Sequence, residues 1–333
     1  MLSGRTRGLL TALAVAALSF STLTLVVRAL PISNLLGLVL TVGSPYAPFA
    51  ALAGLLFSAL SRRTFLTIIA VLVLTASAAI QIPRYYFTRA AGTQFADIRL
   101  LSSNLRKGQA NPTTFVDLAK DSADVVTVSE LTPEAAQSFS QAGLDDAFPY
   151  SVLIPAPGAG GIGLWSRYPV DAVSPGTHRN FTIAAARVRV PGVQLAPLVT
   201  SVHVFSPVSY QRDFVDGWQR SIADAKMVLE DSANVAGEAA VIVAGDFNST
   251  PDMEQFRDLL TTGYRDAADQ TGAGFVPTFP ADSWLPPALE IDHVLTRGAT
   301  ATSLTAVTIT GSDHRALLTT VHVPKTPEKT NDG

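Results

Sequence analysis

The chain has 333 residues, of which 47% are hydrophobic and only 15% charged, an unusually apolar balance for a soluble protein. It contains no cysteine, which excludes disulfides, zinc–thiolate sites, iron–sulfur clusters and a thiol nucleophile. Seven of the 24 basic residues and none of the 27 acidic ones fall in residues 1–96, so residues 97–333 carry a formal charge of −10, which disfavours a nucleic-acid surface.

Residues 1–90 are predicted to be a transmembrane anchor in the lipid bilayer. A helix needs about 20 apolar residues to cross the hydrocarbon, and three uncharged stretches are long enough: Gly8–Val27, Ala29–Leu60 and Thr64–Pro83. Pro45 and Pro48 predict that the second stretch is broken near Gly43–Pro48. A cleaved signal peptide is the alternative for residues 1–27, but two more apolar stretches follow directly.

Arginines near the ends of these stretches predict the orientation, because positive residues are retained in the cytoplasm. With the N-terminus inside, Arg5, Arg7, Arg62 and Arg63 are cytoplasmic, against Arg28, Arg84 and Arg89 outside. Three spans then place the rest of the chain outside the cell membrane. The stretches contain no acidic residue, lysine or histidine, which favours an anchor over a transport pathway.

Short β-rich runs alternate with helical stretches from Asp97 onward, which predicts an α/β fold with many strands. The predicted strands are Ile98–Ser103, Val125–Ser129, Tyr150–Ile154, Ile162–Ser166, Ala184–Val190, Leu198–Val204, Ala240–Ala244, Ile291–Thr296, Thr305–Ile309 and Ala316–Val323. The predicted helices are Pro112–Lys120, Pro133–Ala142, Tyr210–Glu230 and Pro251–Thr261. A long loop is expected over Thr271–Ala288, and a disordered tail over residues 324–333.

The strongest local motif is Gly245-Asp246-Phe247-Asn248, which follows the apolar run Val241–Ala244. Asp246 and Asn248 are two residues apart, so an extended chain presents both on one side, and Gly245 permits a tight bend. The acid can hold a water or a metal while the amide binds a phosphoryl oxygen. The structural alternative is a strand end followed by an Asx turn.

Two further motifs pair a carboxylate with an imidazole at predicted strand ends. Ser312-Asp313-His314 follows one strand, and Ile291-Asp292-His293 begins another. Such pairs suit metal-assisted phosphoryl transfer, in which the aspartate orients the histidine and the histidine stabilises or protonates the phosphate. His293 is expected on the opposite face from Asp292 and is interpreted as structural.

The motifs together resemble the endonuclease/exonuclease/phosphatase superfamily, which includes DNase I-like nucleases, inositol polyphosphate phosphatases and neutral sphingomyelinases. They occur in the superfamily's order over residues 97–323: Ser103-Asn104, Val128-Ser129-Glu130-Leu131, Gly161–Pro169, Ser201-Val202-His203, Gly245–Asn248, Ile291–His293 and Ser312–His314. The resemblance implies a four-layer sandwich, in which two β-sheets pack face to face between outer helices, with an active site at one edge. It also implies a hydrolase acting on phosphate esters.

The same resemblance implies a metal site and its ligands. Glu130 is expected as the principal ligand of Mg²⁺ or Mn²⁺, with Asn104 beside it and Asp313 completing the carboxylate set. Oxygen ligands suit such hard cations. Asn104 has the alternative of a turn residue and Glu130 that of a solvated acid at a strand end.

Catalytic roles are implied for five residues. Asp246 is expected to orient or deprotonate the attacking water, and Asn248 to bind a phosphate oxygen. His314, paired with Asp292, is expected to stabilise the transition state, and His203 to assist the leaving group. His203 has the alternative of a core histidine, and Arg167 is either a phosphate contact or a surface arginine.

Three functions are compatible with these residues. The leading hypothesis is a membrane-bound phosphoesterase that hydrolyses a phosphodiester or phosphomonoester at the membrane surface. An extracytoplasmic nuclease is the enzymatic alternative, which the acidic domain and Glu290, at a position that is basic in many members, both disfavour. A catalytically silent membrane binding module is the third. Because members share the core while loops select the substrate, the loop Thr271–Ala288 is expected to determine specificity.

Overall fold

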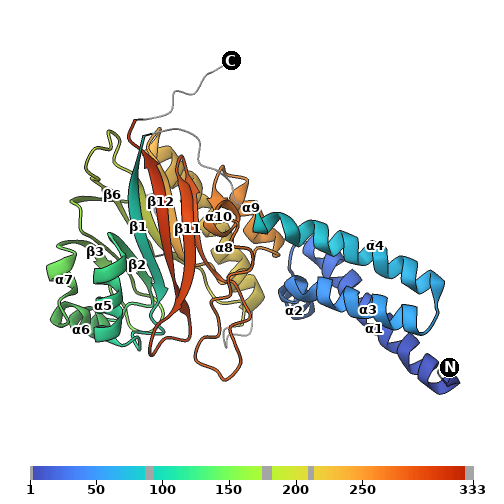
Figure 1. Cartoon of the computed structure of the whole chain (residues 1–333). Helices are drawn as coiled ribbons and strands as arrows, with labels where there is room; N and C mark the ends of the chain where they lie inside the picture. Colours follow the sequence, from blue (N-terminus) through green and yellow to red (C-terminus); the bar gives the residue numbers. More distant parts are fainter. Residues whose placement is uncertain (1–2, 87–93, 175–181, 209–213, 327–333) are drawn as a thin grey trace, which may run out of the picture. The chain divides into compact units, whose positions relative to one another are not determined.

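The computed structural model describes residues 3–86, 94–174, 182–208 and 214–326. The chain divides into two compact units, coloured along the sequence in Figure 1. The first comprises Met1–Tyr85 and Pro251–Arg257, and the second Tyr86–Thr250 and Asp258–Gly333. The two units are described separately below.

The first unit consists mainly of apolar helices. Ser3 caps the first of them by accepting a hydrogen bond from the N–H of Thr6, and Asn34 caps the second in the same way through Gly37. Buried serine and threonine hydroxyls are satisfied by carbonyls, as where Ser21 donates to Ala47 at 2.9 Å. The helices are α1 (Gly4–Arg28), α2 (Leu35–Val42), η1 (Ser44–Tyr46), α3 (Ala47–Leu60), α4 (Thr64–Gln81) and η2 (Ile82–Tyr85).

Two of these helices are long and apolar enough to cross a membrane, judged by length and composition: Gly4–Arg28 and Thr64–Tyr85. The pair Leu35–Val42 and Ser44–Leu60 adds a third candidate if it is counted as one span bent by 41°. The bend lies where the sequence predicts a break, because Pro45 lies in the 3₁₀ turn η1 and Pro48 lies in the first turn of α3.

The second unit is built on two mixed six-stranded sheets. Their orders are β11-β12-β1-β2-β4-β3 and β5-β6-β7-β8-β10-β9, and each has one parallel pair near its centre, β1 with β2 and β7 with β8. The strands are β1 (Phe95–Asn104), β2 (Val125–Ser129), β3 (Tyr150–Ile154), β4 (Ile162–Ser166), β5 (Val170–Val173), β6 (Ala184–Val188), β7 (Leu198–His203), β8 (Val241–Asp246), β9 (Arg265–Asp266), β10 (Asp292–Arg297), β11 (Thr300–Thr308) and β12 (Arg315–Pro324).

The two sheets pack face to face around a shared apolar core. Ile98 and Leu100 of the first sheet belong to the same buried cluster as Ile242 and Val294 of the second. Successive residues of a strand point to opposite faces, so Leu101 joins a second cluster beneath α5 (Pro112–Ser122) and α6 (Pro133–Gln141). On the other side, α8 (Phe214–Ala236) packs on β7 and β8. This helix–sheet–sheet–helix arrangement confirms the predicted four-layer sandwich.

The predicted strands are all observed, with ends shifted by a few residues, and the structure adds short elements that the sequence does not predict. The edge strand β5 and the two-residue β9 have too few residues for a periodic signal, as do α7 (Leu144–Ala147) and α10 (Ala267–Thr271). The helix predicted from Pro251 begins later, as α9 (Glu254–Leu260), because residues 251–253 form a turn. The predicted start of α8 at Tyr210 and the tail from residue 327 lie outside the described residues, while Pro324 ends β12.

Candidate functional site

The polar motif residues meet where the central strands of both sheets end. Because β1 and β2 are parallel, as are β7 and β8, each pair delivers its carboxyl ends to one edge. The antiparallel strands β10 and β12 begin at that same edge. The residues placed there are Asn104, Glu130, His203, Asp246, Asp292, Asp313 and His314.

The end of β8 forms a tight turn around Asp246. Gly245 has φ 153°, and a Cβ there would lie 1.9 Å from the carbonyl oxygen of Val202, so only glycine fits. Asn248, at φ 45°, donates its backbone N–H to Asp246 Oδ1 at 2.8 Å. Its side-chain amide donates to Val204 O at 2.9 Å and to Asp246 Oδ2 at 3.2 Å. The turn therefore fixes the carboxylate through the neighbouring asparagine.

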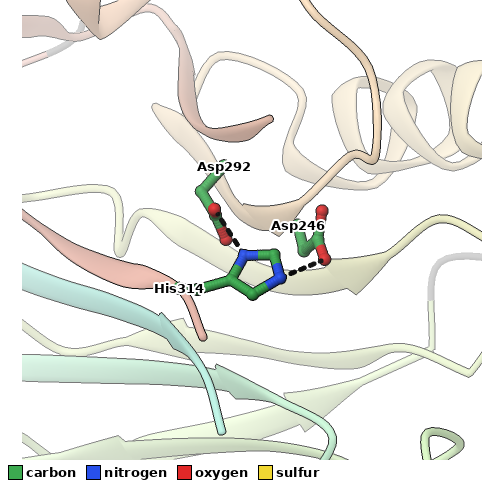
Figure 2. Close-up of side chains that lie close together, drawn as sticks. All are labelled: Asp246, Asp292 and His314. Carbon is green, nitrogen blue, oxygen red and sulfur yellow. Dashed lines mark hydrogen bonds and ion pairs between the residues drawn. The ribbon is translucent and has the colours of Figure 1, made fainter. Parts of the chain in front are cut away.

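His314 lies between two aspartates, as Figure 2 shows. Its Nδ1 is 2.8 Å from Asp292 Oδ2, and its Nε2 is 3.8 Å from Asp246 Oδ2. Burial alone would lower the pKa of His314, but the negative charges of Asp292 and Asp246 outweigh it and raise the pKa to about 10. The imidazole is therefore protonated at neutral pH, and it presents an N–H to Asp246.

Asp246 is fully buried, and this burial raises its pKa to about 6, although His314 acts in the opposite direction. Its Oδ2 also accepts a 2.9 Å hydrogen bond from the amide of Asn104. A carboxylate with a raised pKa is a stronger base than an ordinary aspartate, so this environment suits proton abstraction near neutral pH.

Asn104 and Glu130 lie side by side at the ends of β1 and β2. The Asn104 amide is 3.2 Å from Glu130 Oε1, and Glu130 Oε2 accepts from the backbone N–H of Lys107 at 2.7 Å. Glu130 adopts φ 59°, which is strained for a residue with a side chain and is frequent at functional sites. Asn104 Oδ1 accepts from the N–H of Arg106 at 2.8 Å. The pair is thus held by the loop after β1.

Asp313 is connected to this pair through Arg106. The Arg106 Nε lies 3.8 Å from the Asp313 carboxylate, and its Nη1 lies 2.7 Å from Asp282. Within the described residues, the acids and histidines that converge to within 4.8 Å are Asp246, Asp292 and His314. This group differs from the ligand set expected from the sequence, which was Asn104, Glu130 and Asp313.

His203 faces the two carboxylates from the end of β7. Its Nε2 is 3.7 Å from Asp246 Oδ2 and 3.8 Å from Glu130 Oε1. Its Nδ1 lies 3.1 Å from the carbonyl of Ala159, which can only accept, so Nδ1 carries the proton. His203 is therefore part of the site edge and not of the apolar core.

Two other residues of interest serve the fold. His293 points away from Asp292, with Nδ1 2.7 Å from Asp266 and Nε2 2.9 Å from Ser249 O. Arg167 donates its Nε–H to Ala123 O and stacks over Phe148, so neither the phosphate contact nor the free surface position describes it. The arginine that does reach the site, Arg106, lies in a left-handed turn that no periodic pattern indicates.

Comparisons with known proteins agree with this architecture. The profile of the Endonuclease/Exonuclease/phosphatase family matches residues 95–314. No curated protein matches the chain. Humanized D. rerio TDP2 is 19% identical, with a TM-score of 0.53 over 68% of this chain and 98% of that one. The 3′ phosphatase NExo from Neisseria, bound to a product DNA hairpin, is 16% identical, with a TM-score of 0.52 over 67% and 98%. At identities this low, the structural similarity shows that the fold is shared.

Proposed function

The chain belongs to the endonuclease/exonuclease/phosphatase family, and we propose that it is a metal-dependent phosphoesterase in which Asp246 activates the attacking water. The observation that supports this most is the arrangement of His314, which is paired with Asp292 and directed at Asp246. A base and a cationic proton donor at one site are what hydrolysis of a phosphodiester or phosphomonoester requires.

We assign the cation to Glu130, Asn104 and Asp313. Their oxygens suit Mg²⁺ or Mn²⁺. The site edge also carries more negative than positive groups, since five carboxylates face the two cationic side chains of His314 and Arg106. The carboxylates are those of Glu130, Asp246, Asp282, Asp292 and Asp313. The trio Asp246, Asp292 and His314 is assigned to catalysis instead, because the 2.8 Å pairing of His314 Nδ1 with Asp292 orients the imidazole towards Asp246. When bound, the cation would neutralise phosphate charge and help to polarise the phosphorus.

The protein's own side chains divide the remaining work. Asp246 orients the water and accepts its proton, and the His314 imidazolium stabilises charge on the phosphoryl oxygens. The side-chain amide of Asn248 donates to a phosphate oxygen of the substrate, and this bond replaces its 3.2 Å hydrogen bond to Asp246 Oδ2. The Nε2 of His203 faces the site, so when the ring carries a second proton there, it can donate that proton to the leaving-group oxygen as the P–O bond breaks.

Residues 1–90 are proposed to anchor this domain in the bilayer through three spans, with the domain outside the cytoplasm. The helices that are long and apolar enough to cross a membrane support the anchor. The three-span arrangement predicts that a periplasm-type reporter at the C-terminus is active. Activity of a cytoplasmic reporter instead would reverse the orientation.

A nuclease is the second candidate, since relatives by fold are a 3′ phosphatase bound to DNA product and TDP2 with single-stranded DNA product. The charge of −10 over residues 97–333 opposes it. A silent binding module is disfavoured because all the implied acids and histidines are in place. The test is turnover by the purified full chain, with and without Mg²⁺, of bis(nitrophenyl) phosphate, plasmid DNA, sphingomyelin and inositol phosphates. Absence of turnover on all four would refute the proposal.

A further inference from the structure

The loop before β10 carries an exposed aromatic and aliphatic pair. Trp284 is 91% exposed and Leu285 53% exposed. No charged residue lies between Asp282 and Glu290. Ser283 Oγ accepts from the N–H of Leu285 at 3.1 Å and donates to its carbonyl at 3.0 Å, so a local turn holds the pair in place. Single exposed apolar residues are ordinary, but a fully exposed tryptophan in a structured turn is not.

The base of this loop is bound to the site itself. Asp282 pairs with Arg106 Nη1 at 2.7 Å, and Ala281 donates its N–H to the carbonyl of Asp313 at 2.6 Å. Arg106 in turn donates its backbone N–H to Asn104. The apolar tip is therefore carried at a fixed position beside the proposed metal ligands.

A second apolar segment leaves the site edge from β7. Val204 donates its N–H to the carbonyl of Asp246, and the chain then exposes Phe205 by 56% and Val208 by 64%. Residues 204–208 are also uncharged. Both segments thus begin beside residues of the candidate site and expose apolar side chains, and these four residues are named the apolar rim: Phe205, Val208, Trp284 and Leu285.

We propose that the apolar rim seats the active site on a zwitterionic phospholipid surface, so that the substrate is a lipid-borne phosphate ester. This inference rests on the proposed function and specifies its substrate class. Tryptophan with an aliphatic neighbour suits the membrane interface, where the ring meets headgroups and the aliphatic group meets acyl chains.

The sequence of the chain indicates that a bilayer is the surface that the apolar rim contacts. Two of its helices are apolar enough to span one, and residues 86–94 connect the end of η2 to the start of β1. A connector of that length spans at most about 30 Å even when fully extended, so the domain stays near the surface.

The net charge of residues 97–333 indicates which kind of lipid surface this is. With a formal charge of −10 over residues 97–333, the domain is repelled by anionic lipids and by nucleic acid alike. Docking through the apolar rim requires no positive charge and is insensitive to salt. Stacking of Trp284 on a nucleobase is the competing use of this residue, and it would need a positively charged groove beside it.

The first test uses the full chain in phosphatidylcholine nanodiscs. Because the chain has no cysteine, a nitroxide can be placed singly at Trp284→Cys, Leu285→Cys or the control Leu195→Cys. Leu195 is exposed and precedes β7, at the opposite end of that strand from His203. We expect labels at 284 and 285 to collide more with oxygen than with a water-soluble nickel chelate, and the label at 195 to show the reverse. Equal nickel access at all three positions overturns the proposal.

The same labels distinguish the nucleic-acid alternative. Protection of the 284 label by single-stranded DNA, lost at high salt and absent with phosphatidylcholine, would overturn bilayer docking in favour of base stacking.

The second test compares two alkyl para-nitrophenyl phosphates with the same leaving group, one long-chain and held in the nanodisc, the other short-chain and soluble. In Trp284→Ser/Leu285→Ser, the ratio of turnover on the long-chain substrate to that on the short-chain substrate should fall about tenfold or more. An unchanged ratio contradicts the inference. If the wild type hydrolyses neither of these substrates nor any of the four substrates named above, the proposed function fails, while the label collisions still decide whether the rim contacts lipid.

Discussion

Asp292 lies directly opposite Asp246 in the antiparallel pairing of β10 with β8, and His314 bridges the two carboxylates. The sheet register therefore sets the spacing of the catalytic charges. One carboxylate holds the imidazolium and the other remains as the base, although the two are neighbours across the same pair of strands.

Asp292→Asn should lower kcat by about 10²–10⁴-fold, because it removes the charge that keeps His314 protonated while preserving the shape of the side chain. The pKa of His314 should fall from about 10 towards its ordinary value. Kinetics and an NMR titration of the imidazole measure both effects. An unchanged pKa of His314 would show that Asp292 does not control its protonation.

Glu130→Gln should raise the Mg²⁺ concentration needed for half-maximal activity by about tenfold or more, because a neutral amide binds a divalent cation more weakly than a carboxylate. A magnesium titration of activity, supported by Mn²⁺ binding measured by EPR, gives the shift. Glu134→Gln is the matched control, since Glu134 is exposed in the first turn of α6. Equal effects of the two substitutions would remove Glu130 from the metal site.

Gly245→Ala should abolish activity and lower stability, because the new Cβ would collide with Val202 O in the neighbouring parallel strand. Gly217→Ala in α8 is the control, since a Cβ there meets no atom within 4 Å and alanine favours helix. Thermal unfolding and turnover of both variants provide the comparison. A fully active Gly245→Ala variant would mean that the turn around Asp246 is not required.

His293 should make stability depend on pH in the alkaline range. Burial would lower its pKa, but the charge and hydrogen bond of Asp266 raise the pKa to about 9. A raised folded-state pKa contributes stability that is fully present below about 6.5 and is lost as pH rises through about 9, a loss of order 3 kcal/mol. Denaturant unfolding from pH 6 to pH 10 measures it.

The control for this prediction is His293→Gln, which should flatten that part of the pH dependence, while His322→Gln, in the partly exposed pair with Asp97, should not. Parallel curves for the wild type and His293→Gln would assign the alkaline loss to other groups.

The sequence allowed prediction of the features that repeat or that end strands. Apolar runs predicted the strands of both sheets, and the resemblance in motif order placed Asp246 and His203 in one site with Asn104 and Glu130, which the parallel pairs β1–β2 and β7–β8 bring to one edge. Arg106 could not be predicted, because three successive left-handed residues, Arg106 to Gly108, carry it to Asp313 without any periodic signal. The pairing of His314 with Asp292 is implied by the resemblance and is observed, whereas the position of Asp292 opposite Asp246 depends on strand register, which motif order alone does not specify.

The most direct measurement of the central claim is the rate of bis(nitrophenyl) phosphate hydrolysis by the full chain at saturating Mg²⁺, for the wild type and Asp246→Asn, with His322→Gln as control. If Asp246 activates the water, Asp246→Asn should lower kcat by about 10²–10⁴-fold, while His322→Gln retains wild-type turnover. A folded Asp246→Asn variant that keeps wild-type kcat would contradict the account.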